Sequence, residues 1–114
     1  MVKSVVFATV KQIGLTMPDV EASIRYDGLE VLKAGGSFMA GIATDESAEA
    51  DTLVVRCDYD DRQLMLEDAP ETYYLTDYYA KYPLVLVRLS EVTEDALRDL
   101  LSVSRKMALE KNRR

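Results

Sequence analysis

The chain of 114 residues contains no histidine, no tryptophan and a single cysteine, Cys57. Without histidine, one subunit cannot assemble a Ser-His-Asp triad, a Cys-His pair or a histidine-ligated metal centre. A lone cysteine forms no internal disulfide, which agrees with a reducing compartment. These absences leave enzymatic activity open but favour a protein that is not an enzyme.

Long apolar runs are missing as well. No segment approaches the roughly 20 apolar residues of a membrane-spanning helix, and Lys11 and Gln12 interrupt the N-terminal stretch before a signal-peptide core could form. Five glycines, three prolines and 48% hydrophobic residues are typical of a folded protein. We therefore expect one cytoplasmic domain over residues 1–114, without membrane contact.

The net charge of −6 is unevenly distributed. Residues 105–114 hold five cations and one carboxylate, a net charge of +4 that leaves −10 for the rest. An acidic body repels phosphate backbones, so charge makes nucleic acid an unfavoured partner. The basic tail has a simpler role, because cations in the last turn of a helix offset its macrodipole.

Apolar periodicity predicts three helices. The first covers about residues 3–15, with an apolar stripe from Val2 to Ile13, and is ended by Gly14 and Pro18. Asp58 is the expected cap of the second, which extends to about residue 68, and Thr93 is the expected cap of the third. The third helix should bury Leu97, Leu100, Leu101, Ser104 and Met107 or Ala108.

Short segments typical of strands lie between the helices, at residues 20–26, 29–34, 37–43, 52–57 and 84–89. Asp27-Gly28 and Gly35-Gly36 are turn signals of antiparallel hairpins. The order is helix, three or four strands, helix, two strands, helix. This order predicts an α+β fold, in which a two-layer antiparallel sheet carries helices on one face.

Five of the seven tyrosines lie between Glu71 and Pro83, directly before the last strand. Tyrosine combines an apolar ring with a phenol that donates and accepts hydrogen bonds, so such a run suits either a packed layer or a binding surface. In the packed interpretation, either Tyr73 alone or Tyr73 together with Tyr79 enters the core, and the other rings cover the sheet edge.

In the binding interpretation, a cleft lies between the sheet and residues 70–83, and its lining comes from four residues of the run: Tyr74, Thr76, Tyr78 and Tyr82. Arg56 or Arg88 would supply a cation for an anionic group. Strand alternation places Arg88 in a row with Leu84 and Leu86. That arginine is either paired with a carboxylate or available to a ligand.

Other candidate sites have simpler explanations. Cys57 stands beside Arg56 before a helix, where a nucleophilic thiolate is conceivable, but a buried cysteine acting as a small apolar residue is commoner. Asp58, Asp60 and Asp61 suit helix capping better than a metal loop. Gly35-Gly36 lacks the helix and lysine of a phosphate loop. We expect no metal and no cofactor.

Several blocks carry a family resemblance that runs over most of the length. They are Pro18-Asp19-Val20-Glu21, residues 51–58 (DTLVVRCD), residues 70–76 (PETYYLT), and Tyr79 with residues 82–89 (YPLVLVRL). In these blocks the chain resembles the MmcQ/YjbR-like family of small bacterial proteins. The resemblance implies a two-layer fold related to secretion-chaperone-like domains, and a DNA-binding label that the family often carries.

The chain departs from the family pattern at two places. The first hairpin lacks a Thr-Pro pair that often follows Tyr26, and Tyr78 stands where a histidine is frequent before Tyr79. The missing histidine removes the family's best candidate for a proton-transfer group.

Three functional hypotheses follow. The first is a non-enzymatic domain that binds a small ligand or a protein partner through the tyrosine-rich segment. The second is the DNA binding implied by the family label, which the acidic body opposes. A distant third is an enzyme that uses Cys57 or tyrosine chemistry.

Overall fold

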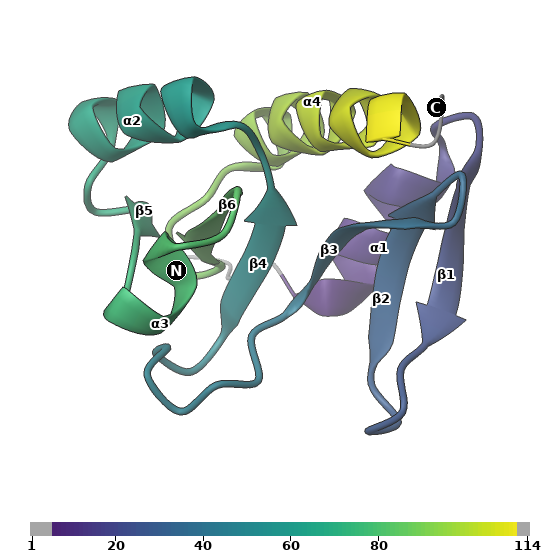
Figure 1. Ribbon diagram of the computed structural model, residues 1–114, viewed down its shortest axis with the longest axis horizontal. Coiled ribbons are helices and arrows are strands. Elements are labelled where there is room, and N and C mark those ends of the chain that lie inside the picture. The colour runs from purple at the N-terminus through teal and green to yellow at the C-terminus, as the bar shows by residue number, and fades with distance from the viewer. Residues whose placement is uncertain (1–5, 112–114) are drawn as a thin grey trace.

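The computed structural model describes residues 6–111, and the fold is shown in Figure 1. The elements follow the order α1 (Phe7–Leu15), β1 (Val20–Ile24), β2 (Glu30–Ala34), β3 (Ser37–Ile42), β4 (Thr52–Arg56), α2 (Tyr59–Asp68), β5 (Tyr73–Tyr74), α3 (Asp77–Ala80), β6 (Leu84–Arg88) and α4 (Glu94–Lys111). In these described residues no helix is long and apolar enough to cross a membrane.

The six strands form one antiparallel sheet in the order β1-β2-β3-β4-β6-β5. This confirms the predicted α+β class. Helices α1, α2 and α4 pack on one face of the sheet, which we call the helical face. The short helix α3, which the sequence did not predict, packs on the opposite face.

The main core fills the space between the helical face and α1 and α4. Along β4 and β6, Val55 and Val85 point into this core and contact the layer that includes Leu97 and Leu101 of α4. The alternate residues Val54 and Leu86 point the other way, into a second apolar cluster around Tyr79 of α3. The neighbouring strands β4 and β6 are therefore buried on both faces.

The helix ends confirm two predicted caps. The Asp58 carboxylate accepts the backbone N–H of Asp61 at 2.7 Å, and the Thr93 hydroxyl accepts that of Ala96 at 3.1 Å. Helix α2 ends at Asp68 as predicted. Each cap satisfies an N–H that the first helical turn leaves unpaired.

The first helix differs from its prediction. It begins at Phe7, because Val6 has an extended backbone, and the predicted stripe residue Val2 lies outside the described residues. Gly14 does not end the helix but is buried inside it. A Cβ at this position would lie 2.6 Å from Cδ1 of Leu32, so the glycine allows α1 to approach β2 closely.

Both predicted hairpin signals mark turns. Gly35 and Gly36 have φ of +57° and +84° and form a two-residue connection between β2 and β3. The first hairpin needs a longer loop, residues 25–29, in which the N–H of Arg25 donates to the carbonyl of Leu29 at 2.8 Å. This loop extends the β1–β2 hairpin beyond the regular sheet.

Ser104 ties α4 to the sheet by a buried hydrogen bond, in which its Oγ donates to the carbonyl of Met39 at 3.0 Å. We expect Ser104→Ala to lower the free energy of unfolding by about 1–2 kcal/mol, because it leaves a buried carbonyl unpaired. Urea denaturation measures this loss. The matched control is Ser102→Ala on the exposed side of α4, expected within about 0.5 kcal/mol of wild type. Equal stability of the two variants would contradict the assignment.

Candidate functional site

The tyrosine run does not form one continuous surface. Tyr73 and Tyr74 make up β5, Tyr78 and Tyr79 lie in α3, and Tyr82 follows in the turn before β6. Tyr73 packs toward the helical face, whereas Tyr74 and Tyr79 pack on the opposite face. The five rings are thus divided among different surroundings.

Tyr74 and Tyr79 hold the loop between β3 and β4, residues 43–51. The phenol oxygen of Tyr74 accepts the backbone N–H of Glu49 at 2.8 Å and lies 2.6 Å from the hydroxyl of Thr52. The phenol oxygen of Tyr79 accepts the backbone N–H of Asp45 at 3.1 Å. Both phenols are therefore occupied by the protein itself.

Arg88 and Thr76 serve the same loop. The Arg88 guanidinium donates two hydrogen bonds to the Glu49 carboxylate, at 3.0 and 2.8 Å, and stacks over the Tyr74 ring at 4.3 Å. The ion pair lowers the pKa of Glu49 and raises that of Arg88. The Thr76 hydroxyl caps α3 and lies 2.9 Å from the hydroxyl of Ser47. Of the two alternatives predicted for Arg88, a carboxylate partner or a ligand, the structure shows the carboxylate partner.

Tyr78 and Tyr82 behave differently, because they line a cavity of about 220 Å³ on the face opposite α4. We call this cavity the tyrosine cleft. Tyr79 also contributes to its wall, and the other lining residues come from the sheet and its loops: Arg25, Phe38, Ile42, Thr44, Val54 and Leu84. Tyr74, Thr76, Arg56 and Arg88 are not among them.

The two cleft tyrosines remain available for contacts. Tyr78 is 47% exposed and Tyr82 43% exposed, their ring centroids lie 6.2 Å apart, and the Lys81 ammonium lies within 5.6 Å of both. Within residues 6–111 neither phenol has a hydrogen-bond partner. The neighbouring Tyr82 raises the pKa of the Tyr78 phenol.

Helix α2 fixes the turn that carries Lys81 and Tyr82. Nη1 of Arg62 donates to three carbonyls, those of Ala80 at 3.0 Å, Tyr82 at 2.9 Å and Leu84 at 3.3 Å. The Tyr59 hydroxyl adds a bond to the Lys81 carbonyl at 3.2 Å. Because these contacts hold backbone atoms, they do not use the side chains of Tyr78, Lys81 or Tyr82.

Arg56 lies beside the tyrosine cleft. It is directly opposite Leu84 in the β4–β6 ladder and shares a strand face with Val54, and both of these residues line the cleft. Burial lowers the pKa of its guanidinium. In the described part of the chain, the Arg56 side chain has no hydrogen bond and no ion pair.

Arg25 lines the cleft, and the sequence analysis missed it. Its guanidinium pairs with Asp27, which lowers the pKa of that carboxyl. Its Nε is buried without an acceptor, and no other buried side-chain nitrogen or oxygen in the described part of the chain lacks a partner. Alternation along β1 puts Arg25 on the face of Ser23, but only the sheet order and the loop geometry bring it to residues 78–82.

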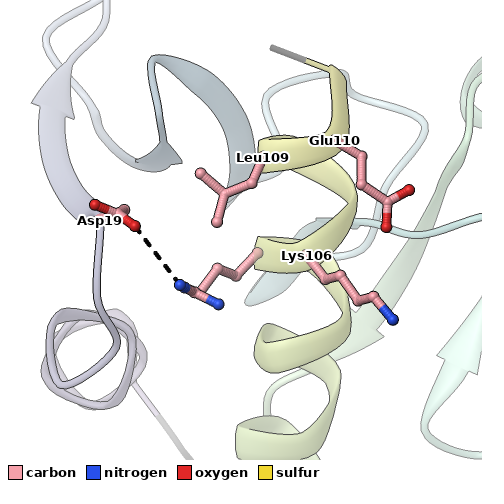
Figure 2. A pocket seen from close by; sticks show the side chains of 5 residues that line it. Asp19, Lys106, Leu109 and Glu110 are labelled. Carbon is pink, nitrogen blue, oxygen red and sulfur yellow. Dashed lines mark ion pairs between the residues drawn. The ribbon is translucent and has the colours of Figure 1, made fainter. Parts of the chain in front are cut away.

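Larger hollows lie elsewhere on the described residues. One, of about 400 Å³, flanks the end of α4, where Arg105 bonds the Pro18 carbonyl at 2.6 Å and pairs with Asp19 at 3.7 Å. Figure 2 shows this ion pair beside Leu109, with Lys106 and Glu110 projecting from the other side of the helix. The arginine of this hollow, Arg105, is therefore already bound by other residues of the protein.

The second hollow is an apolar groove of about 330 Å³ between α2 and α4, which lie next to each other along the top of Figure 1. Leu64 and Val103, 59% and 41% exposed, contribute to its lining, and Asp61 and Asp99 flank it.

Within residues 6–111, no group of three carboxylate or cysteine side chains could hold a metal ion.

Replacing Tyr74 by phenylalanine removes the phenol that accepts the Glu49 N–H and contacts Thr52. We expect a loss of about 1–3 kcal/mol in the free energy of unfolding, because polar groups lose their partner. Thermal or urea denaturation measures it. Tyr26→Phe is the control, since Tyr26 is fully exposed, and it should change stability by less than about 0.5 kcal/mol. A silent Tyr74→Phe variant would argue against the role of this phenol in holding the loop.

Cys57 is completely buried, and burial raises the pKa of its thiol to about 12. At pH 8 the thiolate fraction is then on the order of one in ten thousand. We expect a thiol reagent such as 5,5′-dithiobis(2-nitrobenzoate) to leave Cys57 unmodified in the native protein and to modify it fully in denaturant. Native-state modification at the rate of a free cysteine peptide would instead mark an activated thiol.

Comparisons with known proteins identify the fold. No protein-family model matches the chain, and no curated protein matches it significantly in sequence. Its structure is similar to the crystal structure of Deinococcus radiodurans protein DR2400, whose domain is classed under the family model DUF419, with a TM-score of 0.74. The match covers 97% of this chain and 84% of that one at 18% sequence identity. The chain therefore has the fold of a DUF419 domain.

Proposed function

We propose that the chain is a non-enzymatic binding domain of the cytoplasm that holds a small ligand in the tyrosine cleft. The observation that carries the proposal is the division of the tyrosine run. The phenols of Tyr74 and Tyr79 are used by the protein's own backbone, whereas Tyr78 and Tyr82 line a cavity with unpartnered phenols. Rings held at a fixed place with free polar ends are suited to recognition.

The size and walls of the cleft favour a small ligand. Ligand sites are concave, mostly apolar and carry a few placed polar groups. The cleft has apolar walls from Phe38, Val54 and Leu84, and polar groups from the two phenols and Arg25. A volume of about 220 Å³ suits a compact molecule or one group of a larger one. A protein partner that inserts a single side chain is the alternative.

We also propose that the chain belongs to the MmcQ/YjbR-like family. Support comes from the sequence blocks around residues 51–58, 70–76 and 82–89, and from the similarity in fold to a domain of DUF419, which is itself a YjbR/MmcQ-like family. The DNA-binding label of that family gains no support from the described residues. The net charge is −6, and Arg105 of the basic tail is engaged by Asp19.

A fragment screen by protein-observed NMR tests the proposed function. We expect hits whose chemical-shift changes centre on residues 78–82, with dissociation constants of about 0.1–5 mM, the range of compact ligands. The double variant Tyr78→Ala, Tyr82→Ala should weaken these hits at least about tenfold, since it removes both free ring walls. Both side chains are about half exposed, so the variant should remain folded.

Leu64→Ala is the matched control, because it also truncates a large exposed apolar side chain but lies in α2, outside the cleft. It should leave fragment binding unchanged. The proposed function fails if a broad screen of charged and neutral fragments gives no hit at the cleft. It fails equally if the hits bind the double variant as well as the wild type.

A further inference from the structure

We infer that the ligand of the tyrosine cleft is a small monoanion, a carboxylate attached to a flat apolar body. The inference rests on the proposed function and deepens it by assigning a chemical class to the ligand. It is carried by two arginines with unused hydrogen-bonding capacity: Arg25, which lines the cleft, and Arg56, which lies beside it.

Arg25 provides the first argument. Its side chain is 24% exposed and its Nε is buried, yet this N–H has no acceptor in the described structure. A buried donor without a partner is unfavourable, so such groups are rare in proteins unless something else satisfies them. The neighbouring Asp27 engages Nη2 and leaves Nε unpaired. A ligand oxygen in the cleft would supply the missing acceptor.

Arg56 provides a second, independent argument. Its position opposite Leu84 places its Cβ about 5 Å from that of a residue in the cleft wall. The guanidinium is half-buried and has no carboxylate partner in the described structure, although the chain as a whole carries twenty acidic residues. A desolvated cation without a counter-ion is unfavourable, and an anion bound beside it would offset that cost.

The charges at the cleft indicate how much negative charge it accepts. Three cations lie in or beside it: Arg25, Arg56 and the Lys81 ammonium above the Tyr78 and Tyr82 rings. Two carboxylates accompany them, Asp27 on Arg25 and Asp45, whose field reaches the Tyr78 phenol. The balance is one positive charge. A single carboxylate neutralises this charge. A phosphate dianion would leave the site with one net negative charge, close to the two aspartates.

The walls indicate what carries that carboxylate. The Tyr78 and Tyr82 rings lie 6.2 Å apart at 57° to each other, and Phe38, Val54 and Leu84 complete an apolar surface. Flat apolar groups pack on such rings with offset or edge-to-face geometry. The unpartnered phenols of Tyr78 and Tyr82 can donate hydrogen bonds to the same carboxylate.

The test is an NMR titration of ¹⁵N-labelled protein with matched pairs of aromatic compounds. The panel contains benzoate, 1-naphthoate, 2-naphthoate and indole-3-carboxylate, the primary amide of each, and phenyl phosphate and naphthyl phosphate as dianions. The backbone amides of residues 78–82 and the arginine Nε–H signals are followed. We expect at least one carboxylate to bind at the cleft, its amide to bind at least about tenfold more weakly, and the Arg25 Nε–H signal to shift on binding.

Variants assign the preference to the arginines. Arg25→Gln and Arg56→Gln should each reduce the preference for carboxylate over amide, while Arg98→Gln, an exposed arginine of α4, should leave it unchanged. Should Arg25→Gln disturb the first hairpin, the Arg56→Gln variant and the Nε–H signal of wild-type Arg25 still decide the question.

The outcomes separate the two proposals. If carboxylates and amides bind equally and both are lost in Tyr78→Ala, Tyr82→Ala, the anion inference is overturned and the cleft remains a binding site. If the phosphates bind more tightly than the carboxylates, the inference that the ligand carries a single negative charge is overturned. If no carboxylate binds below about 5 mM, the inference is overturned whatever the neutral fragments do. Binding that is insensitive to all the cleft variants removes the proposed function as well.

Discussion

The burial of β4 and β6 on both faces is the constraint on which the rest of the structure depends. An antiparallel sheet usually leaves one face to water and alternates apolar with polar residues. Here the alternate positions Val54 and Leu86 are apolar too, so a second layer must cover them. Tyr79 of α3 provides this cover, and the helices cover the other face. The segment between β5 and β6 therefore has to fold back across the sheet.

This requirement explains how the tyrosines are used. Tyr79 enters the second cluster, and its phenol, together with that of Tyr74, satisfies backbone N–H groups of the β3–β4 loop. Because α3 turns Tyr79 into the sheet, its neighbour Tyr78 points outward, and Tyr82, which follows the end of α3, is also about half exposed. The same fold-back that completes the core thus leaves two rings in front of the sheet. We regard the tyrosine cleft as a consequence of the way the second face is covered.

The parts of the fold that depend on local sequence could be predicted. Asp58 and Thr93 cap helices because their side chains reach N–H groups three residues away, and the residues of β6 alternate because the strand is pleated. Three features depend on residues far apart in the chain and were missed. The glycine at position 14 is required because α1 approaches Leu32 closely. Helix α3 forms where Val54 has to be covered, and Arg25 reaches the cleft because of the order of the strands in the sheet.

Acetylation of the native protein with N-acetylimidazole, read by mass spectrometry residue by residue, tests the division of the tyrosines most directly. The reagent modifies free phenols, and fully exposed Tyr26 provides the internal reference. The account predicts that Tyr78 and Tyr82 react at rates within about tenfold of Tyr26, whereas Tyr74 and Tyr79, whose phenols are hydrogen-bonded, react only after unfolding. Reaction of Tyr74 and Tyr79 as fast as Tyr26, or protection of Tyr78 and Tyr82, would contradict it.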